Sequence, residues 1–253
     1  MISNNPKIRS VNPIVGETND GRLNDIQGRH VKMKHVLEAI KNAKSGPVKE
    51  GSVGAGTGTR ALGFKGGIGT SSRVLPKKIG GYSIGVLVQS NFGNSLVVNG
   101  APVGRELSKS SFSSSIPYDE DEGSCMIVIA TDAPLSNRNL KRIAKRAIIG
   151  IGKVGGYASN GSGDYVIAFS TYKDTSSDKI TSDRTSVRNN AMTSLFQATV
   201  EATEEAIINS IFMAETVSST LGKSEELPIK ETIKILKKYN SLNWNKELHP
   251  WKK

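Results

Sequence analysis

The pattern of apolar and polar positions predicts helices and strands that alternate along one chain. Apolar residues recur at helical spacing in four segments: 31–43, the stretch after Ser136, 191–217 and 229–239. Short apolar runs bounded by glycine or polar residues predict strands at 81–89, 95–100 and 165–171, and one more that starts at Ser124. Because strands and helices are interspersed and no linker separates them, we expect one α/β (α+β) domain.

Glycine and polar residues dominate the segments between these elements. Residues 51–70 contain glycine too often for an ordinary helix, which favours tight turns or close backbone packing. A phosphate-binding loop is the alternative, but the spacing matches neither Gly-x-x-x-x-Gly-Lys-[Ser/Thr] nor Gly-x-Gly-x-x-Gly. Residues 105–122 are polar, rich in serine and without a period, so we expect an exposed loop there.

The composition is that of a globular protein. Hydrophobic residues make up 36% of the 253 residues, which suffices for a packed core. The apolar runs are too short to cross a bilayer, and residues 1–7 lack the apolar stretch of a signal peptide. We therefore expect a cytoplasmic protein without membrane contact.

Cysteine and histidine, the residues that most often bind zinc, are few and scattered. Cys125 is the only cysteine, which excludes intrachain disulfides and thiolate metal clusters. The three histidines, His30, His35 and His249, form no His-Glu-x-x-His pattern. We expect neither a metal ion nor another cofactor.

A net charge of +11 raises the question of nucleic-acid binding. The lysines and arginines are spread along the chain, however, and aromatic residues make up only 6%, so few side chains are available to stack on bases. A solvated basic surface is the better interpretation, and we expect no nucleic-acid partner.

Ser124 is the strongest candidate for chemistry. It follows Gly123 at the end of the polar loop and stands at the first position of a predicted core strand. Such a serine can attack the peptide carbonyl on its N-terminal side, and the freed α-amine can then act as base for the hydroxyl beside it. The thiol of Cys125 is an alternative nucleophile, but it points to the opposite face of the strand and is expected in the core.

Other polar residues stand next to predicted strands. Asn91 follows the strand at 81–89, and Ser162 and Asp164 precede the strand at 165–171. Taken one at a time, Asn91 is better explained as a turn former, Asp164 as a loop cap and Glu17 as a surface carboxylate. Spacing alone does no more than suggest a shared site.

Several segments in one order resemble the self-processing serine aminopeptidases, a family that includes L-aminopeptidase/D-Ala-esterase/amidase and the β-peptidyl aminopeptidases. The similarity runs from about Pro13 to Leu221. It is carried by residues 16–26, 54–58, 63–73, 86–93, 123–135, 160–164 and 201–207.

The resemblance implies an architecture and a processing event. The expected fold is an αββα four-layer sandwich similar to that of N-terminal-nucleophile hydrolases. The chain is expected to be cut between Gly123 and Ser124, so that one structural domain consists of segments 1–123 and 124–253. Homo-oligomeric assembly is expected as well.

The resemblance also implies roles for individual residues. Ser124 matches the nucleophile, and Asn91 matches the amide donor to the oxyanion. Ser162 and Asp164 match a Ser-x-acidic pair that holds the hydroxyl and the α-amine of the nucleophile. An α-amine, with a reference pKa of about 7.7 to 8.0, can accept the serine proton near neutral pH.

Two further residues concern the substrate. Glu17 matches an acidic receptor for the free ammonium of the substrate, which would restrict cleavage to N-terminal residues of short peptides, amino-acid amides or esters. Asn19 stands where several family members carry an aromatic residue, so we expect a more polar acyl-side pocket here.

Family members usually carry a further stretch before the segment that matches Pro13, so we expect the N-terminal portion of the fold to be missing and apolar surface to be exposed. The alternative is a truncated member that is catalytically silent, or that depends on a separately encoded N-terminal fragment. An acyltransferase similar to the ornithine acetyltransferases is a further alternative, but those enzymes use a threonine nucleophile.

Overall fold

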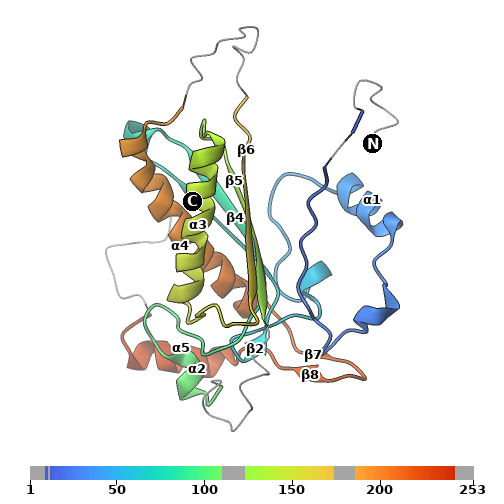
Figure 1. Cartoon of the computed structure of the whole chain (residues 1–253). Coiled ribbons are helices and arrows are strands. Elements are labelled where there is room, and N and C mark those ends of the chain that lie inside the picture. The colour runs from blue at the N-terminus through green and yellow to red at the C-terminus, as the bar shows by residue number, and fades with distance from the viewer. Residues whose placement is uncertain (1–8, 11, 110–122, 174–185, 243–253) are drawn as a thin grey trace.

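The computed structural model describes residues 9–10, 12–109, 123–173 and 186–242. Its centre is a four-stranded sheet in the order β3-β4-β5-β6 (Figure 1). The strands are β3 (Ile68–Val74), β4 (Ser83–Asn91), β5 (Ser124–Thr131) and β6 (Gly163–Ser170). β4 pairs antiparallel with β3 and β5, whereas β5 and β6 run parallel. The last two strands therefore begin at the same end of the sheet, which is also the end where β4 finishes.

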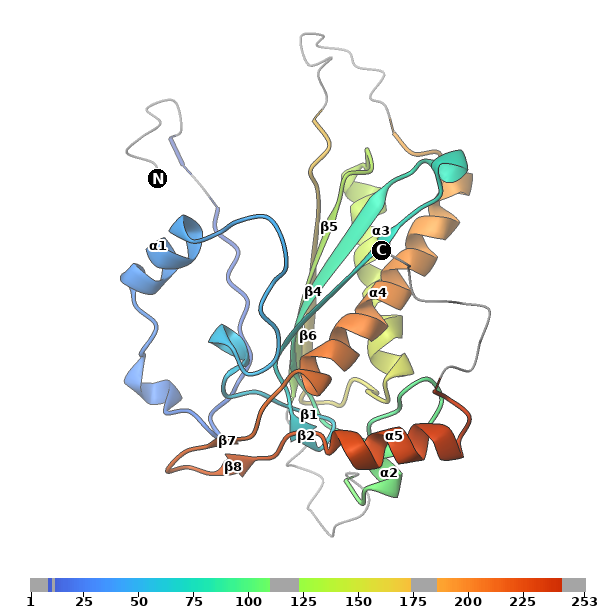
Figure 2. The same cartoon turned by 180° about the vertical axis from the view of Figure 1, so that it is seen from behind.

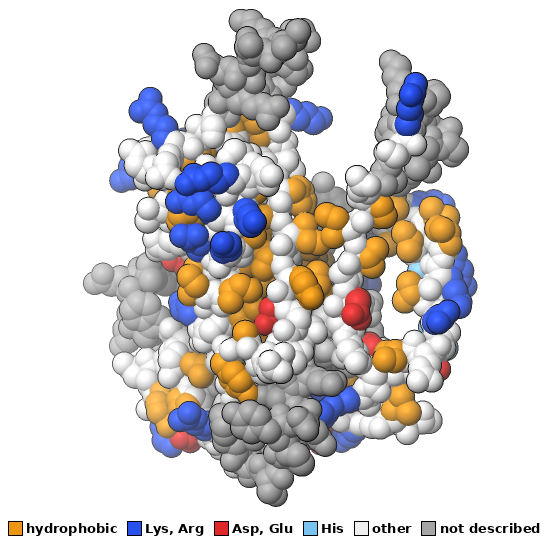
Figure 3. All heavy atoms as spheres, viewed as in Figure 1, with side chains coloured by type: hydrophobic (Ala, Val, Ile, Leu, Met, Phe, Trp, Pro, Cys, Tyr) orange, Lys and Arg blue, Asp and Glu red, His pale blue; other side chains and the backbone are white. Residues whose placement is uncertain are grey.

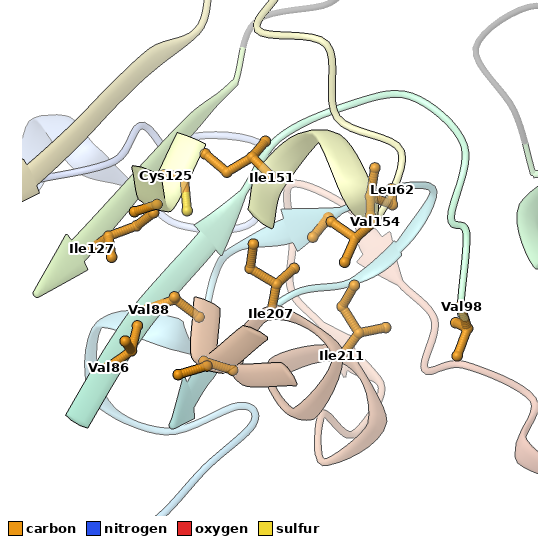
Figure 4. Close-up of a cluster of buried hydrophobic side chains, with 14 of the residues drawn as sticks. Leu62, Val86, Val88, Val98, Cys125, Ile127, Ile151, Val154, Ile207 and Ile211 are labelled. Carbon is orange, nitrogen blue, oxygen red and sulfur yellow. The ribbon is translucent and has the colours of Figure 1, made fainter. Parts of the chain in front are cut away.

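Two long helices, α3 (Asn137–Lys153) and α4 (Met192–Phe212), cover one face of this sheet (Figures 1 and 2). Alternate residues of each strand point to one face, so Val86 and Val88 of β4 lie beside Ile127 of β5 in the core. Ile151 and Ile207 of the helices pack against them (Figure 4). Burying each such side chain contributes about 1.5–3 kcal/mol. The core therefore lies between the sheet and this helix layer.

The opposite face of the sheet is largely open. Tyr165 and Phe169 of β6 are 63% and 45% exposed, and Val74 of β3 is exposed as well. Hydrophobic side chains gather between α3 and the N-terminal segment in Figure 3. The mixed α/β class is confirmed; within the described residues, one sheet and one helix layer of the expected αββα sandwich are present.

The remaining elements are short. They are α1 (Met33–Lys41), α2 (Val103–Glu106), α5 (Ile229–Lys238), the hairpins β1 (Arg60–Ala61) with β2 (Phe64–Lys65) and β7 (Val217–Ser218) with β8 (Lys223–Ser224), and the 3-10 turns η2 (Ile26–Gly28), η3 (Gly54–Gly56), η4 (Lys77–Ile79) and η6 (Asn189–Ala191). α1 lies apart from the sheet and buries none of its residues (Figures 1 and 2). In the part of the chain that the structure describes, no helix has the length and apolarity needed to span a membrane.

Two predicted elements differ from the structure. The helix expected at 191–217 ends at Phe212, because the hydroxyl and N–H of Thr216 donate to the Glu226 carboxylate and draw the chain into the β7–β8 hairpin. The strand expected at 95–100 is only an isolated bridge between Val98 and Ala101. Its tip is a tight turn at Asn99, where φ is positive.

Candidate active site

Ser124 stands at the first position of β5, in a row that crosses three strands. The register places Asn91 of β4 on one side of it and Gly163 of β6 on the other. The Ser124 hydroxyl donates to the carbonyl oxygen of Gly123 at 2.7 Å. The Gly163 N–H donates to the same oxygen at 3.0 Å. Two donors thus polarise the carbonyl group of the peptide bond that precedes Ser124.

Glycine is required before Ser124 because the chain there lies close to the end of β4. A Cβ atom on Gly123 would approach the Cα of Phe92 to 2.8 Å and the carbonyl oxygen of Asn91 to 3.2 Å. Such contacts are too short for backbone atoms that are fixed in a sheet. Any larger residue would displace the junction from β4 and from the Gly163 N–H.

Asn91 is 8% exposed, and backbone groups hold its side chain from two sides. Its Oδ1 accepts from the N–H of Arg60 at 3.0 Å, and its Nδ2 donates to the carbonyl oxygen of Asn19 at 2.8 Å. These contacts fix which end of the amide is the donor. Since a primary amide has two N–H groups, one remains for a further acceptor.

Ser162 and Asp164 lie beside the start of β5. The Ser162 hydroxyl donates to Asp164 Oδ2 at 3.0 Å. Burial raises the pKa of the Asp164 carboxyl. Hydrogen bonds from the Ser162 hydroxyl and the Cys125 N–H favour the charged form and lower the pKa, but burial has the larger effect. Asp164 Oδ1 is buried and accepts no hydrogen bond from the described residues. A buried oxygen without a donor is suited to receive an ammonium group.

Asp164 and Ser162 also line a small pocket that opens to solvent. Phe92, Ile151 and Tyr157 form its apolar walls. The pocket lies where β6 begins and the loop after α3 ends. It places the Asp164 carboxyl at the N-terminal end of β5.

A segment near the N-terminus crosses the open face of the sheet toward Ser124. Gly16 lies against the flexible end of the Met126 side chain, and Thr18 accepts a hydrogen bond from Gln89 at 2.8 Å. Glu17 stands between these two contacts, and its side chain is exposed. The segment therefore brings Glu17 over the face to which Ser124 points.

Asn19 contributes to the site through its backbone. Its side-chain oxygen accepts from the N–H of Gly21 at 3.0 Å and so stabilises the following turn. Its carbonyl oxygen is the acceptor for Asn91. The polar side chain of Asn19 thus stabilises the loop, while the main-chain carbonyl of Asn19 orients the Asn91 amide.

Cys125 is confirmed as a core residue. Its side chain is fully buried on the helix-covered face, and burial, followed by the nearby Asp164 carboxylate, raises the pKa of the thiol. The thiolate is therefore disfavoured. No group of three or more His, Cys, Asp or Glu residues in the described part of the chain is placed to hold a metal ion.

The sequence did not predict two hydrogen-bond donors of the site. They are the N–H of Arg60, which donates to Asn91, and the N–H of Gly163, which donates to the Gly123 carbonyl oxygen. Both are main-chain donors, which every residue except proline has. Only the pairing of distant segments places them at the site. The glycine at position 163, between the two predicted site residues, was the nearest hint.

The comparisons with known proteins identify the family of the chain. The sequence matches Peptidase family S58 over residues 1–225. It is 45% identical over 246 residues to "Beta-peptidyl aminopeptidase BapA" of Sphingosinicella microcystinivorans, and the match covers 91% of this chain and 62% of that protein. The chain thus spans less than two thirds of the length of this curated relative.

Solved structures show the same relation. The PH0078 protein from Pyrococcus horikoshii OT3 has a TM-score of 0.83 and 45% identity, covering 95% of this chain and 67% of that one. The L-aminopeptidase D-Ala-esterase/amidase from Ochrobactrum anthropi, described as a new variant of the Ntn hydrolase fold, has a TM-score of 0.78 and 37% identity, covering 88% and 62%. By sequence and by fold, the chain belongs to Peptidase family S58.

Proposed function

We propose that the protein is a self-processing serine aminopeptidase or amidase, which removes N-terminal residues from short peptides, amino-acid amides or esters through an acyl-enzyme on Ser124. The observation that carries this proposal is the pair of hydrogen bonds from Ser124 and Gly163 to the Gly123 carbonyl. The names of the relatives, which include a β-peptidyl aminopeptidase and an L-aminopeptidase, support the substrate class.

Self-cleavage begins with attack of Ser124 Oγ on the Gly123 carbonyl carbon. The hydroxyl proton moves to the amide nitrogen, the C–N bond breaks, and an ester joins Gly123 to Ser124. Water then hydrolyses the ester, which releases the Gly123 carboxylate and leaves Ser124 with a free α-amine. The Gly163 N–H stabilises the negative charge that develops on the carbonyl oxygen.

In the mature enzyme, the α-amine of Ser124 takes the hydroxyl proton as Oγ attacks the substrate carbonyl. The free N–H of Asn91 Nδ2 donates to the resulting oxyanion. Asp164, through the open Oδ1, and Ser162 hold the α-amine in place. The amine then protonates the leaving group, and water releases the acyl group from Ser124.

Two residues select the substrate. The exposed carboxylate of Glu17 receives the ammonium group of the substrate on the open face of the sheet. Asn19 lies at the edge of the same region and makes the acyl-side pocket more polar than an aromatic residue would.

Ser124→Ala tests the proposal most directly. The wild-type chain is expected to yield two fragments that meet between Gly123 and Ser124, and to hydrolyse an aminoacyl p-nitroanilide; the variant should stay at 27.1 kDa and be inactive. Mass spectrometry and the release of p-nitroaniline measure both. Hydrolysis by the variant would show that the nucleophile is wrong.

The open sheet face favours a second possibility, in which activity depends on a partner. A sheet with Tyr165 and Phe169 exposed on one face buries more apolar surface when another layer covers it. We propose that a further polypeptide, corresponding to the part of the relatives that this chain does not match, covers this face, and that the assembled enzyme is a homo-oligomer. Addition of that polypeptide should then raise the activity of a chain that is weakly active alone.

A further inference from the structure

Lys65 of β2 is a fully buried lysine next to the proposed site. Its Nζ donates to the carbonyl oxygens of Gly56 at 2.7 Å, Thr59 at 2.8 Å and Gly66 at 2.7 Å. All three N–H groups of an ammonium are thereby used. A buried charge is costly, and here it is compensated by carbonyl dipoles. Burial lowers the pKa of Lys65 to about 8, while nearby Asp20 raises it.

One of the three acceptors belongs to the peptide group that fixes Asn91. The Thr59 carbonyl accepts from Lys65, and the N–H of the same peptide group, on Arg60, donates to Asn91 Oδ1 at 3.0 Å. A hydrogen bond to the oxygen of a peptide group polarises its N–H and makes it a stronger donor. The effect continues through the Asn91 amide, since an acceptor bond at Oδ1 makes the Nδ2 protons more acidic.

The loop that carries this peptide group is held against the end of β4. The N–H of Gly66 also donates to the Thr59 carbonyl, at 3.1 Å. A Cβ on Gly66 would lie 2.5 Å from the carbonyl oxygen of Ser90, the residue before Asn91. Lys65 therefore connects three turns of a loop that packs closely against the end of β4, next to Asn91.

We propose that Lys65 is a positioning residue for the oxyanion donor: its ammonium group holds and polarises the Thr59–Arg60 peptide group, which orients and strengthens the Asn91 amide. The inference rests on the proposed function only in taking Asn91 as the donor to the oxyanion. Lys65 itself touches neither the substrate nor Ser124 in this scheme.

The first test measures hydrolysis of an aminoacyl p-nitroanilide by Lys65→Met in the wild-type and Asn91→Ala backgrounds. In the wild-type background, kcat should fall about tenfold to a hundredfold, the range for hydrogen bonds to charged groups, with KM nearly unchanged. In the Asn91→Ala background, the further loss should shrink to less than about twofold, because the two residues act in series. Equal losses in both backgrounds would overturn the proposal.

Two variants separate this role from a merely structural one. Lys145→Met removes an exposed lysine of α3 and should leave kcat unchanged. Lys65→Arg keeps the charge but cannot direct three donors to three converging carbonyls, so its kcat should lie between those of the wild type and Lys65→Met. If Lys65→Met does not fold, Lys65→Arg takes its place in the two-background comparison.

The second test needs no activity and uses the uncleaved Ser124→Ala chain labelled with ¹⁵N. Adding Lys65→Met should shift the Arg60 amide proton and the Asn91 side-chain amide protons upfield, as weaker hydrogen bonds require, while Lys145→Met leaves them in place. If these resonances do not shift, Lys65 does not strengthen the Arg60 and Asn91 hydrogen bonds, and the proposal is wrong. If Ser124→Ala still hydrolyses substrate, the proposed function fails, yet the resonances still decide the role of Lys65.

Discussion

The Asn91 amide is oriented by one donor and one acceptor, both from the main chain. Replacing Asn91 with Ala is expected to lower kcat by about 10²–10³-fold, the cost of losing one oxyanion donor, with a smaller change in KM. Steady-state kinetics on an aminoacyl p-nitroanilide would measure it. Asn137→Ala, at the exposed start of α3, is the matched control. A loss of less than tenfold in kcat would mean that another group stabilises the oxyanion.

The Asp164 carboxyl gives a prediction for pH. Burial raises its pKa in the folded chain above the unfolded value, so between these two values the folded state holds a proton that the unfolded state has lost. The stability that Asp164 contributes is therefore present at low pH and is lost as the pH rises through the folded pKa.

Urea unfolding of uncleaved Ser124→Ala chains, with and without Asp164→Asn, tests this linkage. Because Asn does not titrate, Asp164→Asn should reduce the decline in the free energy of unfolding as the pH rises from acid to neutral. Identical pH dependence in the two proteins would contradict a raised pKa for Asp164.

At the level of residues, the sequence places the candidate residues Ser124, Asn91, Ser162 and Asp164 at the ends of predicted strands. In the structure Ser124 is the first residue of β5, Asn91 the last of β4 and Asp164 the second of β6, while Ser162 directly precedes β6. Lys65 and the Arg60 N–H could not be predicted, because a lysine in a glycine-rich segment has the composition of an exposed turn. Its burial depends on three carbonyls that the fold brings together.

Among the elements, β3 depends most on close packing. A Cβ on Gly69 would overlap the carbonyl oxygen of Ala206 and lie 2.5 Å from the N of Ser210, both in the backbone of α4. Gly69→Ala should therefore destabilise the fold by about 1–3 kcal/mol, since the helix must move away from the sheet. Gly85→Ala, in β4, is the control, because its Cβ would meet no atom within 4 Å.

Urea unfolding of both variants in the uncleaved background measures the difference in the free energy of unfolding. If Gly69→Ala were no less stable than Gly85→Ala, the contact between β3 and α4 would be looser than the structure indicates.

The helices and strands differ in the sequence pattern that predicts them. Periodic apolar residues predicted α3, α4 and α5, and continuous apolar runs predicted β4, β5 and β6. β3 was missed because its Gly69, Thr70 and Ser71 show no apolar alternation, and its extended form comes from pairing with β4. The parallel register of β5 and β6, which places Gly163 beside Ser124, is likewise a property of the assembled sheet.

For the whole molecule, the open sheet face is the main feature. Replacing Tyr165 and Phe169 together with serine should reduce the fluorescence of the apolar dye ANS in the presence of the chain, because the exposed aromatic surface binds it. Met213→Ser removes an exposed apolar side chain outside the sheet and serves as the control. Undiminished fluorescence in the double variant would place the apolar surface elsewhere, for instance on α1.

The order of strands in the sheet has a consequence for the proposed cleavage before Ser124. β3 and β4 precede the junction, β5 and β6 follow it, and α4, from the second segment, covers β3 and β4. The core is shared between the two pieces, so refolding of a chain that has been cut is expected to be a second-order reaction whose rate depends on concentration. The uncut chain folds in a first-order step. If the proposed cleavage takes place, a molecule that later unfolds in dilute solution is expected to separate into two pieces that do not readily refold.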